Sequence, residues 1–211
     1  MTDARLLPAE LPLFPLQGCI LLPGELLPLN IFEPRYLNMI DDARAGHGHI
    51  GIVQPAAPAP TGEPVLLQTG TAGSIKSFVE TPDGRYLITL SGVSRFSLRG
   101  ETAGAAPYRI GHADYQPYAA DLAARVPLSG DRDRLVQLVR SWFAGLGLQT
   151  DWGLMADMPL EQLVDKLAMM APFTPAARQG LLEAADPAAR LSQLEALIAT
   201  QIAGSAGGTL Q

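Results

Sequence analysis

The sequence is poor in cysteine and lysine, and these two shortages exclude several kinds of chemistry. Cys19 is the only cysteine among 211 residues, so the chain has no internal disulfide and no metal site made of several thiolates. Neither of its two lysines, Lys76 and Lys166, follows a glycine, which excludes the Gly-Lys-Ser/Thr core of a phosphate-binding P-loop. His47 and His49 have no cysteine or carboxylate beside them, and we expect them in a solvated loop rather than at a metal ion.

Long apolar runs and an excess of positive charge are also missing. No apolar run approaches the roughly 20 residues needed to span a bilayer, and Pro8, Glu10 and Pro12 interrupt the first apolar stretch, so we expect no signal peptide. Asp and Glu outnumber Lys and Arg by 21 to 15, and both halves of the chain are acidic. This even acidity argues against an extended phosphate-binding surface. We therefore expect a cytoplasmic protein that binds neither nucleic acid nor a membrane.

The stretch from Leu11 to Tyr36 organises the first half of the chain. Its two apolar runs, 11–16 and 26–32, are short enough for strands, and their prolines exclude a helix through either run. Proline cannot donate to a β-ladder, so we expect these strands at a sheet edge, at a strand end or at a bulge. The sequence Glu33-Pro34-Arg35-Tyr36 then predicts a helix that has Pro34 at its first position.

From Val65 to Tyr115 the apolar residues alternate with a period of two, which predicts further strands. Thr81-Pro82-Asp83-Gly84 is typical of a type I turn, and it joins 75–80 to 85–90 as a hairpin. Two more strands are expected over 93–98 and 108–115. Six or so antiparallel strands around one short helix predict a small, partly closed barrel.

Beyond Tyr118 the apolar period changes to 3.6, which predicts helices. Thr174-Pro175 and Asp186-Pro187 each place a capping side chain before a proline and indicate two more helix starts. Four amphipathic helices with short links predict a small bundle. The expected class is therefore α+β, with a β-rich lobe over 8–117, a helical bundle lobe over 118–204 and a disordered tail over 205–211.

The opening stretch also carries a resemblance to a known family. LPLFPL at 11–16, LLPG at 21–24 and LPLNIFEPRYLNMI at 27–40 resemble the opening of the Lon protease N-terminal domain, and Gly92-Val93-Ser94-Arg95-Phe96 continues the likeness. The likeness is greatest to small stand-alone bacterial proteins built from that domain. It implies a PUA-like pseudo-barrel that helps to recognise and hold polypeptide substrates. The ATPase and Ser-Lys peptidase modules of full-length Lon are not expected here.

The expected function is a non-catalytic module that binds an unfolded polypeptide or a partner protein. We expect no catalytic residue, no cofactor and no metal, and the sequence does not predict an oligomeric state. The candidate peptide-binding residues are Phe32, Glu33, Arg35 and Tyr36, which would form a peptide-contacting rim. A structural interpretation of the same residues stays open, in which Glu33 favours the positive end of the helix and Arg35 pairs with a neighbouring carboxylate.

Two other functions remain as alternatives. PUA-like barrels can bind RNA, and a cluster of arginines on one face would favour that function; the candidates are Arg85, Arg95, Arg99 and Arg109. The chain lacks His-Glu-x-x-His and Gly-x-Ser-x-Gly motifs. A hydrolase of another kind would need a pocket that contains a perturbed His112 or Cys19.

Overall fold

The computed structural model describes residues 7–56 and 62–207 and divides the chain into two compact units. The first unit comprises Met1–Ala124 with Thr174–Leu182, and the second comprises Arg125–Phe173 with Glu183–Gln211. The first boundary thus falls later than the predicted residue 117. In addition, Thr174–Leu182 was expected in the helical lobe but groups with the β-rich unit.

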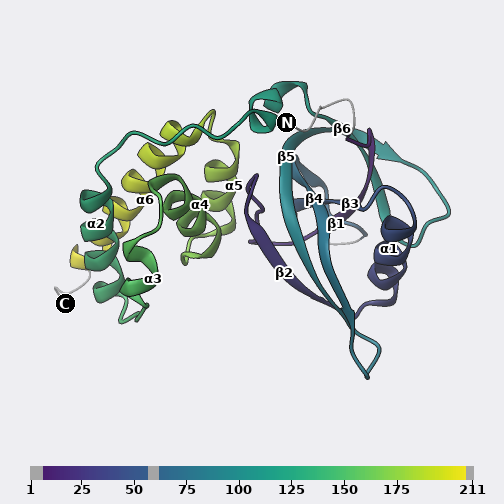
Figure 1. The fold of residues 1–211 in the computed structure, drawn as a ribbon, viewed down its shortest axis with the longest axis horizontal. Coiled ribbons are helices and arrows are strands. Elements are labelled where there is room, and N and C mark those ends of the chain that lie inside the picture. Colours follow the sequence, from purple (N-terminus) through teal and green to yellow (C-terminus); the bar gives the residue numbers. More distant parts are fainter. Residues whose placement is uncertain (1–6, 57–61, 208–211) are drawn as a thin grey trace. The chain divides into compact units, whose positions relative to one another are not determined.

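The β-rich unit is built on one six-stranded sheet, with one helix, α1 (Pro34–Ala45), following the second strand (Figure 1). The strands run in the order β2-β5-β4-β3-β1-β6, and an additional pairing between β5 and β6 closes five of them into a barrel. This arrangement confirms the predicted pseudo-barrel, and β2 remains as an edge strand that pairs with β5. The strands span β1 (Glu10–Pro15), β2 (Leu26–Ile31), β3 (His49–Pro55), β4 (Leu66–Glu80), β5 (Tyr86–Thr102) and β6 (Arg109–Asp114).

The prolines of β1 show how a proline-bearing strand fits inside a sheet. β1 pairs with β6 over Glu10–Leu13 and with β3 over Leu13–Pro15, so each of its prolines has a ladder partner on one side only. Each proline therefore sits where the strand is locally an edge, as its missing N–H requires. The pairing of β1 with β3 is parallel, which corrects the expectation of a wholly antiparallel sheet.

The two strands expected over 85–90 and 93–98 form the single long strand β5, which bends where its register with β4 shifts. At this bend the Gly24 N–H donates to the Gly92 carbonyl at 2.8 Å, and the Gly92 N–H donates to the Glu25 carbonyl at 2.9 Å. A Cβ at position 92 would overlap the carbonyl group of Leu22. Only glycine therefore allows the Pro23-Gly24 turn to approach the bend so closely.

Helix α5 (Pro175–Glu183) is held to the β-rich unit by buried side-chain amides, which explains its grouping there. Gln54 donates to Gln179 Oε1 at 3.0 Å and to the Pro175 carbonyl at 3.2 Å. Gln179 in turn donates to the Thr69 carbonyl at 3.1 Å. Buried amides need such partners, so the polar network fixes where α5 docks. Helical periodicity alone carries no sign of these contacts.

The helical unit contains α2 (Arg132–Gly145), α3 (Trp152–Ala156), α4 (Leu160–Met170) and α6 (Pro187–Gly207). In its core, Trp142 stacks on Phe173 with ring centroids 4.9 Å apart and donates its indole N–H to Gln201 at 3.1 Å. Because α6 continues to Gly207, the predicted tail begins too early, and 208–211 lie outside the described residues. In the described part of the chain, no helix combines the length and apolarity needed to cross a bilayer. The cytoplasmic location stays a prediction.

Candidate functional site

The four candidate residues between β2 and α1 do not form one exposed rim. Phe32 is 63% exposed, whereas Tyr36 is only 7% exposed and packs against Phe14 with ring centroids 4.3 Å apart. Glu33 precedes the first turn of α1 without a side-chain capping hydrogen bond, and its carboxylate pairs with Arg35 at 3.0 Å instead. The structure therefore places Phe32 on an outer surface and Tyr36 in the wall of a pocket.

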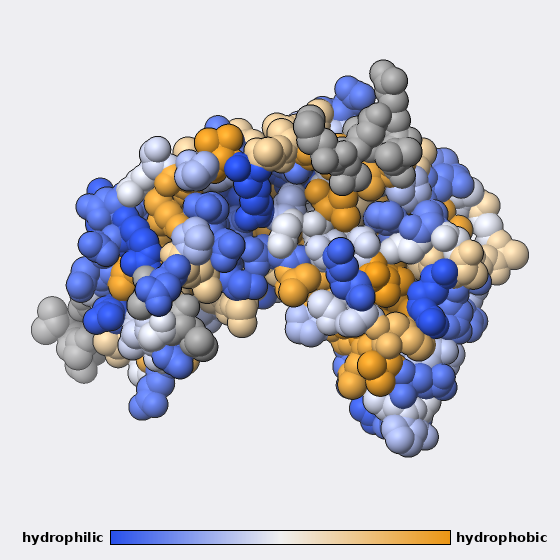
Figure 2. Space-filling model, in the orientation of Figure 1, coloured by the Kyte–Doolittle hydropathy of each residue, from blue (hydrophilic) through white to orange (hydrophobic). Residues whose placement is uncertain are grey.

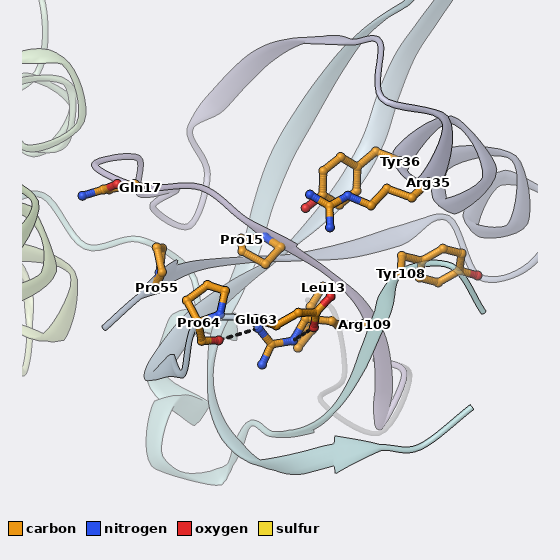
Figure 3. Close-up of a pocket in the computed structure, with 10 residues that line it drawn as sticks. All are labelled: Leu13, Pro15, Gln17, Arg35, Tyr36, Pro55, Glu63, Pro64, Tyr108 and Arg109. Atoms are coloured by element: carbon orange, nitrogen blue, oxygen red, sulfur yellow. Dashed lines mark hydrogen bonds and ion pairs between the residues drawn. The ribbon is translucent and has the colours of Figure 1, made fainter. Parts of the chain in front are cut away.

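This pocket lies in the β-rich unit and has a volume of about 210 Å³ (Figure 3). It is walled by β1, the start of α1, the end of β3, the start of β6 and the residues just before β4. Rings dominate its lining, since three prolines and two tyrosines are among the ten lining residues: Leu13, Pro15, Gln17, Arg35, Tyr36, Pro55, Glu63, Pro64, Tyr108 and Arg109. In Figure 3 the prolines gather on one side, and the tyrosines lie on the other.

Most polar groups of the pocket are already bound to other protein groups. Arg109 donates to both carboxylate oxygens of Glu101 and, at 2.7 Å, to the Pro64 carbonyl; Glu63 lies 3.4 Å from it. The Tyr108 hydroxyl donates to Asp42 at 2.7 Å, and burial together with this hydrogen bond raises the pKa of Tyr108 to about 12. The pKa of Tyr36 is also raised, chiefly because its ring is buried. Both phenols are therefore protonated donors at neutral pH.

A second feature is a set of four exposed apolar side chains, here called the outer patch: Leu26, Val79 and Leu87 on the outer face of the sheet, and Phe32 directly after the end of β2. Leu87 pairs with Asn30 of β2 on one side and with Val79 of β4 on the other, and residues directly opposite one another share a face of the sheet. Leu26 lies on this face too, because it is four residues from Asn30 along β2. The exposed fractions are 51% for Leu26, 57% for Val79 and 45% for Leu87.

On the opposite face, the end of the β4–β5 hairpin contacts α1. Arg44 of α1 stacks over the ring of Phe78 at 3.6 Å, and the Tyr86 hydroxyl donates to Asp41 at 3.2 Å. The alternation of the β4–β5 hairpin therefore buries one set of side chains and leaves the outer patch to solvent. Figure 2 shows hydrophobic surface over this hairpin, above its polar tip. The period of two in this region predicts that alternate side chains share a face, but it does not show which face stays exposed.

The arginines that would favour RNA binding are each held by carboxylates. Arg85 pairs with Asp83, Arg99 with Asp114 and Arg109 with Glu101. The fourth, Arg95, is buried in an ion pair with Asp121. The four arginines therefore do not form a cluster on one open face, which is the arrangement that would favour RNA binding.

The candidates for a hydrolase do not assemble into a nucleophilic site either. His112 lies near Thr102 at 3.0 Å and Glu10 at 3.6 Å, in an exposed position. Burial raises the pKa of the Cys19 thiol, although Arg178 partly opposes this shift, and a raised pKa disfavours the thiolate. The described residues also contain no group of three or more His, Cys, Asp or Glu side chains suited to hold a metal ion.

Comparison with known proteins gives consistent matches. A family model described as the ATP-dependent protease La (LON) substrate-binding domain matches residues 10–200. The Lon protease of Flavobacterium johnsoniae is 30% identical over 104 residues, which is 48% of this chain and 13% of that protein. Lon protease 2 of Sorangium cellulosum is 25% identical over 216 residues, which is 92% of this chain and 25% of that protein. The chain thus spans a quarter or less of the length of these relatives.

Two solved structures show the same fold. One, a Lon N-terminal domain protein from Xanthomonas campestris, has a TM-score of 0.61 and is 24% identical, and the match covers 89% of this chain and 97% of that chain. The other is the N-terminal domain of the Mycobacterium avium complex Lon protease. It has a TM-score of 0.62 at 17% identity, and the match covers 90% of this chain and 98% of that chain.

Proposed function

We propose a polypeptide-binding function for this chain, and the premise is its family: the chain belongs to the ATP-dependent protease La (LON) substrate-binding domain family. The family supports a role in substrate recognition. Our proposal is that the β-rich unit binds unfolded polypeptide segments through the outer patch. The observation that carries it is the exposure of three large apolar side chains on one face of the β2-β5-β4 strands, with a fourth, Phe32, directly after β2.

The expected affinity of the outer patch follows from the area that remains to be buried. Complete burial of a large apolar side chain contributes roughly 1.5–3 kcal/mol, so a half-exposed one contributes on the order of 1 kcal/mol. The four side chains together then supply about 4 kcal/mol, which corresponds to a dissociation constant of about 1 mM. Ordering a flexible segment reduces this gain further. We therefore expect weak, rapidly reversible binding to this surface alone.

Side-chain contact explains the binding better than addition of a strand to the sheet. β2 is the edge strand, and its backbone would be the place for an added strand. Pro28 in the middle of β2 removes one backbone donor from it. Proline is a common device for preventing such edge-to-edge pairing. The proposal therefore rests on the outer patch and not on the free backbone of β2.

We also propose that this chain holds polypeptide without cleaving it and without hydrolysing ATP. The sequence has no Gly-Lys-Ser/Thr motif, and the raised pKa of Cys19 disfavours an activated thiolate. The test is incubation with casein and with ATP, followed by measurement of released peptides and of phosphate. Release of either product that disappears on a point substitution would contradict this part of the proposal.

The binding test compares the chain with a double variant, Val79→Ser and Leu87→Ser. The probe is reduced, carboxymethylated α-lactalbumin, a permanently unfolded protein, which carries a fluorescent label for anisotropy measurement. We expect the double variant to bind about thirty times more weakly, because roughly half of the apolar contact, about 2 kcal/mol, is removed. Thermal melting should change little, since both side chains are exposed.

The matched control is Val126→Ser, which removes a 79% exposed apolar side chain outside the outer patch. We expect this variant to bind the unfolded probe as the unmodified chain does. Equal binding by the chain and by the double variant would refute the outer patch as the binding surface. Equal loss of binding by Val126→Ser and by the double variant would show that the effect is not specific to the patch.

A further inference from the structure

The hydroxyl group of Tyr36 differs from those of the other tyrosines. The sequence contains five tyrosines, and the hydroxyl groups of the other four all have hydrogen-bond partners: Tyr86 with Asp41, Tyr108 with Asp42, Tyr115 with the Pro8 carbonyl and Tyr118 with Thr69. Within residues 7–56 and 62–207, the Tyr36 hydroxyl has none. Its side chain is only 7% exposed. Among the described residues, the hydroxyl is not one of the side-chain atoms that are fully shielded without a partner, so it is open to the pocket that Tyr36 lines.

The surroundings of Tyr36 fix the direction of its ring. Phe14 packs against one side of the ring, and the guanidinium of Arg35 lies 4.6 Å from its centroid. Figure 3 shows the ring extending from α1 toward Pro15, with the hydroxyl at its far end. The ring is thus held in place by packing, and its one donor is presented to whatever occupies the pocket. This is the arrangement of a preorganised binding group.

We propose that this pocket binds an extended, proline-containing polypeptide segment in the polyproline II conformation, and that Tyr36 donates a hydrogen bond to a backbone carbonyl of the segment. Such a segment has no internal hydrogen bonds, so its carbonyls remain available as acceptors. Grooves lined by aromatic rings are a recurring way to recognise it. The inference rests on the proposed polypeptide binding and adds a second, chemically different contact to it.

The size of the pocket favours part of a peptide over a small-molecule cofactor. Sites for small molecules usually have volumes of about 300–1,000 Å³, and this pocket has about 210 Å³. It therefore suits one or two residues of a longer chain. Pyrrolidine rings of the ligand would lie against Tyr36 and Tyr108 on one side and against the pocket's own prolines on the other.

The charges at the pocket favour a basic residue next to the proline-containing segment. The charged lining residues are Arg35, Arg109 and Glu63, and two carboxylates outside the lining, Glu33 and Glu101, pair with the guanidinium groups. Arg109 already donates to Glu101 and to a backbone carbonyl, so it has little to offer an anion. The Glu63 side chain is 62% exposed at the rim. A lysine or arginine of the ligand would complement this charge, whereas an acidic peptide would be repelled.

The test uses a fluorescein-labelled peptide of repeated Pro-Pro-Leu-Pro units that ends in one arginine, with binding measured by fluorescence polarisation. The comparison peptide has alanine in place of every proline. We expect the chain to bind the proline peptide at least five times more tightly than the alanine peptide. No binding of the proline peptide, or equal binding of the two peptides, would overturn the proposal.

The decisive variant is Tyr36→Phe, which keeps the buried ring and removes only the hydroxyl. We expect a five- to tenfold loss of affinity for the proline peptide with an unchanged melting temperature. Tyr86→Phe is the matched control, because it removes a hydroxyl that lies outside the pocket and binds Asp41. Its affinity for the proline peptide should equal that of the unmodified chain. Unchanged binding by Tyr36→Phe would refute the assigned role of the hydroxyl.

The outer patch and the pocket can be tested separately. The double variant Val79→Ser with Leu87→Ser should lose unfolded α-lactalbumin and retain the proline peptide. Tyr36→Phe should show the larger loss for the proline peptide. If the double serine variant also loses the proline peptide, that peptide binds on the outer patch, and the pocket proposal fails while the proposed function stands.

Discussion

A buried ion pair between Arg95 and Asp121 offers a sharp test of how the β-rich unit is held together. Asp121 accepts hydrogen bonds from Arg95 Nε and Nη2, both at 2.8 Å, and from the Arg95 backbone N–H at 2.9 Å. The side chains of Arg95 and Asp121 are 4% and 9% exposed. Arg95 also donates to the Leu182 carbonyl of α5 at 3.0 Å and lies over the ring of Tyr118 at 4.5 Å. One guanidinium thus joins β5, α5 and the 3-10 helix η2 (Gln116–Leu122).

The perturbation is Asp121→Ala, and its cost follows from the charge that it leaves behind. Removing one partner of a buried pair destabilises a protein by about 3–5 kcal/mol, because the other charge stays buried without compensation. Arg95→Met alone should cost a similar amount. The double variant removes both charges, so its cost should fall short of the sum of the two single costs by roughly 2–3 kcal/mol.

Amide hydrogen exchange measured by mass spectrometry is the suitable assay, because it reports on chosen segments. Trp142 and Trp152 both lie in the helical unit, so tryptophan fluorescence does not report directly on the β-rich unit. Protection of the amides of β4 and β5 gives the free energy of opening of the β-rich unit. It is measured in the unmodified chain, the two single variants and the double variant, which together form a double-mutant cycle. A coupling free energy below about 0.5 kcal/mol would refute the reasoning, since it would mean that the two charges act independently.

Two further predictions concern other parts of the chain. Trp142→Ala should lower the stability of the helical unit by about 3–5 kcal/mol, because it removes a buried ring that stacks on Phe173 and leaves the Gln201 amide without its indole donor. Thermal melting followed by near-ultraviolet circular dichroism measures this loss, and an unchanged melting temperature would contradict the prediction. The pKa of Tyr108 is raised to about 12 by burial and by its hydrogen bond to Asp42, so the stabilisation from the protonated Tyr108 hydroxyl is complete below a pH of about 10 and is lost as the pH rises through about 12. Tyr108→Phe should abolish this loss, and phenolate absorbance should show no titration of Tyr108 near the usual pKa of tyrosine.

The features that the sequence predicted well depend on local chemistry. Pro34 begins α1 as expected, because a proline at the first helical position needs no partner for its missing N–H. The Thr81–Gly84 turn joins β4 to β5, and Gly84 has the positive φ that glycine tolerates. The prolines of β1 sit where the strand has one neighbour. In each case a short segment determines the outcome by itself.

The features that it did not predict depend on contacts between distant segments. The docking of α5 depends on Gln54 and Gln179, which are far apart in the sequence and meet only in the fold. The apolar spacing of α5 is the same whichever unit it joins. Likewise, Phe32 and Tyr36 were expected on one rim, because proximity in sequence does not show where each side chain points when the chain passes from β2 into α1. Only the packing of Tyr36 on Phe14 separates the two.

The short link between β2 and α1 connects the two proposed contacts, because Phe32 belongs to the outer patch and Tyr36 to the pocket. A flexible chain bound at one contact therefore meets the other at an effective concentration in the millimolar range. If each contact alone has a dissociation constant near 1 mM, binding at both sites gains only a modest factor, and the complex still dissociates quickly. Such binding would retain segments that offer both an apolar stretch and a proline-containing stretch, and it would release them without any input of energy. Selective but rapidly reversible binding of this kind is what the proposed polypeptide-binding function requires.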